Sequence, residues 1–173
     1  MSDAVYVSAR LAPNHDRSKF TCGVEPLDRY FRHQATQDIR RRIANCFVLV
    51  ENSTGIVAGY YTLSATSLFL TDLPNEQAKR LPRYPIVPTA LVGRLAVASA
   101  YQGRRLGQFL LMDAVDRTAR ADIGAFAIVV DAKDDQARRF YAKYGFAELP
   151  GLERRLYVPI ESILGLLRTL GKR

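Results

Sequence analysis

A strand-like segment runs directly into a glycine-bearing turn and then into a helical pattern at residues 94–111, RLAVASAYQGRRLGQFLL. Residues 95–97 read as a strand, and the apolar residues after the turn recur at helical spacing. A helix that begins there presents backbone N–H groups and the positive end of its dipole. Because Gly103 and Gly107 carry no side chains, a ligand can approach the main chain closely. The turn is therefore a candidate site for an anion such as phosphate, although glycine used for packing in an ordinary connection gives the same pattern.

The rest of the chain predicts an α/β fold. Apolar runs and turn compositions predict strands at residues 5–9, 46–50, 56–70, 89–97, 125–132 and 154–160, and helical spacing predicts helices at 24–44, 105–121, 134–146 and 161–170. The apolar face of the first helix includes Ile43, and the proline-rich segment 73–88 is expected to hold one helical turn and no strand. This order implies a mixed, mostly antiparallel sheet with helices on both faces. At this length, residues 1–173 are expected to form a single domain.

The chain is strongly basic, with 25 lysines and arginines against 17 acidic residues and a formal net charge of +8. Much of the excess lies in clusters, including Arg40, Arg41 and Arg42, and Lys79, Arg80 and Arg83. Clustered guanidinium groups suit phosphate recognition, because each can bind a phosphate through two N–H groups. The charge indicates a polyanionic partner, and solvated helix faces remain the alternative interpretation.

Membrane, metal and disulfide chemistry are not expected. No apolar stretch is long enough to span a bilayer, and the start, MSDAVYVSAR, lacks the basic and apolar regions of a signal peptide, so a cytoplasmic protein is expected. Cys22 and Cys46 form no CxxC pair and are expected to be buried thiols. His15 and His33 have no metal-ligand spacing.

Two motifs together resemble the GNAT acetyltransferase superfamily. Gln102–Gly107, QGRRLG, resembles its pyrophosphate-binding loop, Q/R-x-x-G-x-G/A, and residues 134–146 resemble its N-x-x-A-x-x-x-Y-x-x-x-G-F helix. Arg105 stands where the loop usually has its first glycine, and Asp134 stands where asparagine is usual. Because Arg105 lies at the start of the helix, it is expected to keep ordinary backbone angles. The resemblance covers essentially the whole chain.

A narrower resemblance links the chain to the GNAT toxins of bacterial type II toxin–antitoxin systems. The stretches that carry it are FTCGVEPLDRYFRHQA, GYYTLSATS, LPRYPIVPTALVGRLAV and VVDAKDDQARRFYAKYGF. It implies an enzyme that uses acetyl-CoA to acetylate the α-amino group of the amino acid on charged tRNA, which blocks translation. It also implies a ribbon-helix-helix antitoxin as partner, with a homodimer as a further expectation. The two basic clusters would then contact RNA.

The superfamily resemblance implies where acetyl-CoA would bind. The pyrophosphate would accept hydrogen bonds from backbone N–H groups of the turn, and the pantetheine arm would lie along the preceding strand. The implied cofactor-binding residues are Leu95, Ala96, Val97, Gln102, Gly103, Arg104, Arg105, Leu106, Gly107, Gln108, Asp134 and Phe140. Leu95 and Val97 can serve the core as well, since side chains and main chain face different directions.

Tyr141 is the implied catalytic residue. Amine acetylation needs a neutral nucleophile, a polarised thioester carbonyl and a proton for the departing thiolate. The phenol of Tyr141 is a donor with a reference pKa near ~10, and the resemblance places it beside the sulfur. A buried tyrosine that only packs on the sheet is the alternative interpretation.

No general base stands out, because the candidate carboxylates Glu51, Asp131, Asp134 and Asp135 have turn or capping explanations. An α-amino group has a reference pKa of roughly 7.7–8.0, and esterification of the neighbouring carboxyl lowers it, whereas a lysine near ~10.4 would need a base. The missing base therefore favours an aminoacyl ester as substrate. The alternatives are a GNAT enzyme for a small amine or a protein N-terminus, and a non-catalytic module that binds nucleic acid or acyl-CoA.

Overall fold

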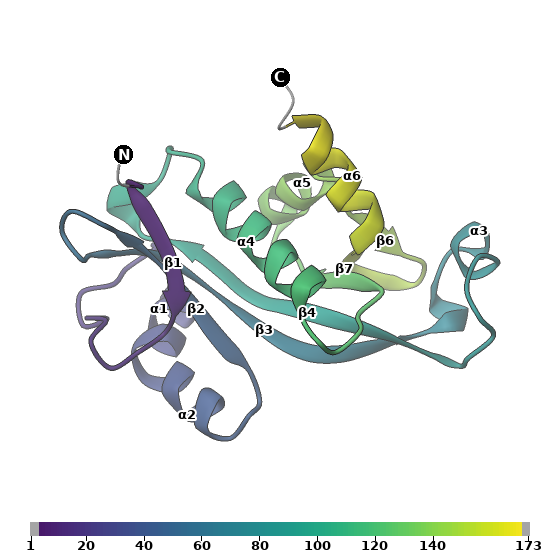
Figure 1. Ribbon diagram of the computed structural model, residues 1–173, viewed down its shortest axis with the longest axis horizontal. Helices are drawn as coiled ribbons and strands as arrows, with labels where there is room; N and C mark the ends of the chain where they lie inside the picture. Colours follow the sequence, from purple (N-terminus) through teal and green to yellow (C-terminus); the bar gives the residue numbers. More distant parts are fainter. Residues whose placement is uncertain (1–3, 171–173) are drawn as a thin grey trace. The chain divides into compact units, whose positions relative to one another are not determined.

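The computed structural model describes residues 4–170, which fall into two compact units (Figure 1). The first unit holds the described residues up to Ser64 together with Gly93–Ala114, and the second holds Ala65–Val92 and the described residues from Val115 onward. Seven strands follow the order β1-β2-β3-β4-β5-β7-β6. The β4–β5 pair is parallel, and the β1–β2, β2–β3, β5–β7 and β6–β7 pairs are antiparallel, so the predicted mixed, mostly antiparallel sheet is confirmed.

The strands are β1 (Tyr6–Arg10), β2 (Asn45–Glu51), β3 (Val57–Phe69), β4 (Ile86–Val97), β5 (Ala127–Asp131), β6 (Ala147–Leu149) and β7 (Leu152–Pro159). The helices are α1 (Glu25–Arg29), α2 (Ala35–Arg40), α3 (Asn75–Ala78), α4 (Leu106–Arg120), α5 (Asp135–Lys143) and α6 (Ile160–Leu170). Shorter helical segments are the π-helical turn η1 (Tyr30–Gln34) and the 3-10 turns η2 (Leu70–Asp72) and η3 (Ser99–Tyr101).

In the first unit, helices cover both faces of the sheet. Tyr60 and Tyr61 are neighbours on β3, so their side chains point to opposite faces. The Tyr60 hydroxyl donates to the Leu27 carbonyl of α1 at 2.7 Å, and the Tyr61 hydroxyl donates to the Asp113 carboxylate of α4 at 2.6 Å. Both rings are fully buried. The predicted placement of helices on both faces is therefore confirmed for this unit.

The helix predicted at residues 24–44 is interrupted by the π-helical turn η1. There the Ala35 N–H bonds to the Tyr30 carbonyl, whereas a regular α-helix would direct it to the carbonyl of Phe31. Arg17 supplies the missing donor, because its Nη1 donates to the Phe31 carbonyl at 2.7 Å and its Nη2 donates to Thr36 Oγ1 at 2.9 Å. A residue from the preceding loop thus stabilises the irregular turn.

The same helix ends earlier than predicted. α2 stops at Arg40, and Arg42 has a left-handed backbone with φ 59°. Ile43, which the helical pattern placed on the apolar face, is 63% exposed. The prediction for Ile43 is wrong because the chain leaves the helix before it reaches this residue.

The second unit is organised around β5. This strand pairs in parallel with Thr89–Val92 of β4 and antiparallel with β7. The side chains of its core come from strands β3 to β7 and from the proline-rich segment: Leu68, Leu73, Val87, Ala127, Val129, Leu149 and Tyr157. The expected helical turn in that segment is α3, at Asn75–Ala78.

Two details of the second unit differ from expectation. β4 begins at Ile86, so the prediction that residues 73–88 hold no strand is wrong. Pro88 lacks an N–H, but its carbonyl still accepts from the Phe126 N–H at 2.9 Å. The three residues of β6 are too few to give a periodic signal, and the sequence did not predict that strand. The other predicted elements are confirmed with small shifts at their ends.

The turn between β4 and α4 is held by the side chain of Gln102. Its amide Nε2 donates to the Val97 carbonyl at 3.1 Å and to the Cys22 carbonyl at 3.0 Å. The Ser99 N–H donates to the Thr21 carbonyl at 2.8 Å. The turn is therefore tied both to the end of β4 and to the loop that precedes α1.

Two residues of this turn have left-handed backbones, Gly103 with φ 82° and Arg105 with φ 60°. The expectation of ordinary angles at Arg105 is wrong, because the chain changes direction from strand to helix within a few residues. A left-handed conformation costs a non-glycine residue roughly 1–2 kcal/mol. Arg105 occupies the position at which the resembling loops carry glycine, which removes that cost.

Replacing Arg105 with glycine should stabilise the protein. Relief of roughly 1–2 kcal/mol of backbone strain exceeds the roughly 0.4–1 kcal/mol that glycine adds to the entropy of the unfolded chain. We expect the free energy of unfolding in urea to rise by about 0.5–1 kcal/mol.

Arg104→Gly is the matched control for this substitution. Arg104 has no left-handed backbone, and its Nη1 donates to the Tyr6 hydroxyl at 3.3 Å, so glycine there should lower stability. A lower free energy of unfolding for Arg105→Gly would contradict the left-handed assignment.

Candidate active site

The first unit presents a turn whose main chain is available to an anion. Residues 103–105 are exposed, and α4 begins at Leu106, so the N–H groups of its first turn have no acceptor within the helix. Left-handed residues next to helical ones direct successive N–H groups into a concave arrangement that suits anions. The dipole of the 15-residue α4 adds partial positive charge at the same end.

The Arg104 side chain is directed away from the turn. Its Nη1 donates to the Tyr6 hydroxyl on β1, and its guanidinium carbon lies 5.1 Å from the centre of the Tyr101 ring. The Tyr101 hydroxyl donates to Glu51 at 2.8 Å. Hydrogen bonds from Thr54 and Tyr101 hold the pKa of Glu51 below its usual value, so this carboxylate is structural. An anion at the turn would therefore depend on the main chain more than on Arg104.

The strand before the turn alternates in burial. Ala96 is buried, while Leu95 and Val97 are half-buried. Ala98 closes the strand by donating its N–H to the Ala58 carbonyl of β3 at 2.8 Å.

Tyr141 lies on α5, in the second unit. This helix is capped by Asp134, whose Oδ1 accepts from the Ala137 N–H at 2.8 Å, and it ends before Gly145, which has φ 89°. The carboxylate of Asp134 is therefore committed to the helix cap, and the helix predicted at residues 134–146 is confirmed.

The ring of Tyr141 is buried between aromatic neighbours. Its centre lies 5.1 Å from that of Phe140 and 5.3 Å from that of Phe146, and the residue is 7% exposed. Burial raises the pKa of Tyr141 above its usual value. Within residues 4–170, no side chain or backbone group is hydrogen-bonded to the Tyr141 hydroxyl. The phenol is thus a protonated donor without a protein acceptor.

The two basic clusters are both exposed, and they belong to different units. Arg40 is the last residue of α2 in the first unit, and Arg41 and Arg42 follow it. Arg80 and Arg83 lie after α3 in the second unit, and Lys79 pairs with Glu76 at 3.4 Å. Exposed pairs of this kind are weak, so the cluster keeps most of its positive charge available.

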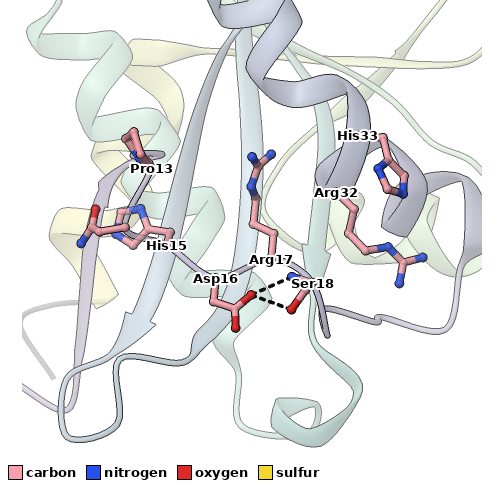
Figure 2. A pocket seen from close by; sticks show the side chains of 8 residues that line it. Pro13, His15, Asp16, Arg17, Ser18, Arg32 and His33 are labelled. Carbon is pink, nitrogen blue, oxygen red and sulfur yellow. Dashed lines mark hydrogen bonds between the residues drawn. The ribbon is translucent and has the colours of Figure 1, made fainter.

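A hollow of about 670 Å³ lies between the loop at residues 13–18 and η1 in the first unit (Figure 2). Figure 2 shows Asp16 turned toward Ser18, whose N–H and hydroxyl donate to its carboxylate at 2.9 and 2.7 Å. His15 Nδ1 accepts from the Ala12 N–H at 2.9 Å, and Arg17 is committed to the π-helical turn. The polar groups that line the hollow mostly stabilise the loop itself, so it carries no catalytic arrangement.

The sequence alone did not single out Arg94. It is a cation in a largely apolar strand, which is the signal that could have found it. Its guanidinium carbon lies 3.5 Å from the centre of the Tyr30 ring.

The two cysteines are buried thiols, as the sequence predicted. Cys22 and Cys46 are buried and form no disulfide, and burial raises the pKa of Cys46 to about 12. Across residues 4–170, no group of three or more His, Cys, Asp or Glu side chains could hold a metal ion. No helix in that range is long and apolar enough to cross a membrane.

Comparison with known proteins gives consistent matches along the chain. A probable toxin TacT of Sinorhizobium fredii is 30% identical over 167 residues, which covers 91% of this chain and 92% of the relative. A tRNA-acetylating toxin of Mycobacterium tuberculosis is 36% identical over 143 residues, covering 82% and 84%.

Solved structures of similar proteins also match this chain over nearly its whole length. AtaT complexed with acetyl-methionyl-tRNAfMet matches with a TM-score of 0.85 and 28% identity, covering 94% of this chain and 99% of that one. AtaTR bound with AcCoA matches with a TM-score of 0.80 and 28% identity, covering 94% and 98%. The model of the acetyltransferase (GNAT) domain family matches residues 42–148. This chain, with a single α/β domain of the GNAT type, belongs to the GNAT acetyltransferase family.

Proposed function

We propose that this protein is a toxin that uses acetyl-CoA to acetylate the α-amino group of aminoacyl-tRNA, and so blocks translation. The observation that carries the acetyl-transfer part is the turn between β4 and α4, with left-handed Gly103 and Arg105 ahead of the α4 N-terminus. The choice of tRNA rests on the 36% identity to a tRNA-acetylating toxin and on the likeness to AtaT complexed with acetyl-methionyl-tRNAfMet.

In this proposal acetyl-CoA binds with its pyrophosphate against the main chain of Gly103–Gln108. The pantetheine arm runs along residues 95–97, where amide groups can pair with main-chain N–H and C=O groups. The thioester carbonyl is attacked by the amine, and the carbon–sulfur bond breaks as the amide forms. No metal is needed, because the reaction proceeds through proton transfer and hydrogen bonding.

We propose that Tyr141 donates a hydrogen bond to the departing thiolate. Burial keeps its phenol protonated at neutral pH. A thiol has a reference pKa of about 8.5, which lies below that of a buried phenol, so complete proton transfer from Tyr141 is uphill. We therefore assign it as a hydrogen-bond donor that stabilises charge on the sulfur, with the proton reaching the thiolate finally from solvent.

The amine needs little help to become nucleophilic. An α-amino group has a reference pKa of roughly 7.7–8.0, which ester formation at the neighbouring carboxyl lowers further, so water can accept its proton. Such a substrate and acetyl-CoA are both found in the cytoplasm, which is where we place the protein. The proposed partners are a ribbon-helix-helix antitoxin and, in the active state, a second copy of the chain.

The direct test is an acetyl-transfer assay with radiolabelled acetyl-CoA. The acceptors are a charged tRNA pool and, in parallel, uncharged tRNA, free amino acids, polyamines and peptides. We expect label on charged tRNA that is released with the amino acid at alkaline pH. Label only on polyamines or peptides would favour the small-amine or N-terminal enzyme, and binding without transfer to any acceptor would favour a non-catalytic module.

Tyr141→Phe should remove most of the turnover, because it deletes one hydroxyl and leaves the ring packing in place. We expect kcat to fall by about 10²–10³-fold, the range for loss of one positioned hydrogen-bond donor to developing negative charge. The Kd for acetyl-CoA, from calorimetry, and the melting temperature should stay close to the wild-type values.

Tyr157→Phe is the matched control for Tyr141. Tyr157 is a buried tyrosine of the same unit, 4% exposed and part of the core around β5. Its substitution should leave kcat unchanged. Equal rates for the two variants would refute the role of Tyr141.

Reversing the charge of Arg80 and Arg83 together should weaken the interaction with charged tRNA. Because fewer counterions would be released, KM for charged tRNA should rise and its dependence on salt should flatten, by a slope of about 0.7–0.9 for each lost phosphate contact. The Kd for acetyl-CoA should not change.

The control is the double variant Lys19→Glu with Arg29→Glu, which alters the net charge equally at exposed residues outside the basic clusters. If both double variants shift KM and the salt slope equally, the effect reflects net charge and the assignment of Arg80 and Arg83 fails.

A further inference from the structure

We propose that Arg94 binds the phosphodiester next to the aminoacylated end of the RNA, and so positions the acceptor for acetyl transfer. This inference rests on the proposed function. It assigns a role to a side chain that neither the turn nor Tyr141 requires.

Arg94 lies on β4 immediately before the segment proposed to hold the pantetheine arm. Its backbone N–H donates to Thr62 Oγ1 of β3 at 3.1 Å, which fixes the strand at this point. Its guanidinium carbon is 3.5 Å from the centre of the Tyr30 ring, which belongs to η1. Because side chains alternate along a strand, Arg94 points to the face opposite Leu95 and Val97. The cation therefore approaches from the side of α1 and η1.

The guanidinium of Arg94 stacks on a ring that is itself fixed by its neighbours. Tyr30 is 7% exposed, and its hydroxyl donates to Asp38 Oδ2 at 2.8 Å. Its ring stacks on that of Tyr60 with centres 6.5 Å apart and planes at 19°. A cation stacked on such a fixed ring loses little further freedom when a ligand binds.

Within residues 4–170, the guanidinium N–H groups of Arg94 have no protein acceptor. Asp38 is the carboxylate whose charge interacts with that of Arg94. Its two oxygens accept hydrogen bonds from the Tyr30 hydroxyl and from Gln34 Nε2, the latter at 3.1 Å. In the part of the chain that the structure describes, no ion pair or side-chain hydrogen bond uses the Arg94 guanidinium. The side chain is only half-buried, so solvent or a ligand can reach it. This leaves a preorganised, partly desolvated cation with its donors unused.

The surroundings of Arg94 keep a positive balance. Burial raises the pKa of Asp38, but hydrogen bonds from Gln34 and Tyr30 and the charges of Arg94 and Arg41 outweigh it, so the carboxyl stays ionised. Arg17 also acts on the buried Cys46 nearby. Arg94 and Arg41 thus both act on the single carboxylate of Asp38, and the excess positive charge favours an anionic ligand.

The chemical groups of aminoacyl-RNA indicate which anion Arg94 would bind. A guanidinium recognises carboxylate or phosphate through two parallel N–H···O bonds. The carboxyl of the amino acid is esterified in aminoacyl-RNA and carries no charge. The nearest anion to the reacting amine is then the phosphodiester between the last two nucleotides. A small amine or a peptide N-terminus has no such group.

The test compares two acceptors that differ by that phosphate. One is the aminoacyl ester of adenosine, and the other is the aminoacyl ester of the dinucleotide CpA with the same amino acid. For Arg94→Gln we expect KM for the dinucleotide ester to rise by about 10–100-fold, typical of a lost charge-assisted pair, with kcat nearly unchanged. KM for the adenosine ester should stay within about twofold, since it has no phosphate to lose.

Arg10→Gln is the matched control, because Arg10 also stacks on an aromatic ring of the first unit, Phe47, at 5.6 Å. It should change KM for neither acceptor. Arg94→Lys keeps the charge and tests the fork geometry if Arg94→Gln unfolds, and it should raise KM for the dinucleotide ester alone.

An equal rise in KM for both acceptors, or no rise for either, would overturn the assignment of Arg94 while the proposed function stands. If the unaltered protein acetylates amines or peptides and neither aminoacyl ester, the proposed function itself fails, and the phosphate contact fails with it.

Discussion

The hydrogen bonds of the Gln102 side chain are the constraint on which the first unit depends. One amide group ties the end of β4, through Val97, to the loop before α1, through Cys22. With these two bonds in place, the chain must leave β4 and enter α4 within a few residues, and Gly103 and Arg105 take left-handed conformations to do so. The backbone strain at Arg105 and the position of the α4 N-terminus thus have one origin. A GNAT enzyme can use that arrangement to hold the pyrophosphate of its cofactor.

The second constraint is the alternation of side chains on β3 and β4. In the first unit, Tyr60 and Tyr61 hydrogen-bond to helices on opposite faces of the sheet, so helices cover both faces there. On the face of α1, the same alternation places Arg94 on the Tyr30 ring. We infer that the main chain of β4 binds the cofactor, whereas one side chain of the same strand, Arg94, binds the acceptor.

Local signals in the sequence were enough to predict much of this fold. The hairpin of β2 and β3 follows from its apolar runs and turn composition, and α5 follows from its Asp134 cap and its glycine stop. The π-helical turn could not be predicted, because its stabilising donor, Arg17, comes from a separate loop. The left-handed Arg105 was missed because a helix start ordinarily permits common angles. Arg94 depends on a ring that only the tertiary fold brings to it, and the roles of the site residues remain predictions.

Hydrogen exchange of the protein is the direct test of whether the backbone after β4 holds acetyl-CoA. Amide exchange measured by mass spectrometry, with and without saturating acetyl-CoA, reports on each segment separately. We expect slower exchange at residues 95–97 and 103–108 when the cofactor is bound, with little change at the exposed residues 40–42. Saturable binding that leaves exchange at residues 103–108 unchanged and protects a different segment would contradict it.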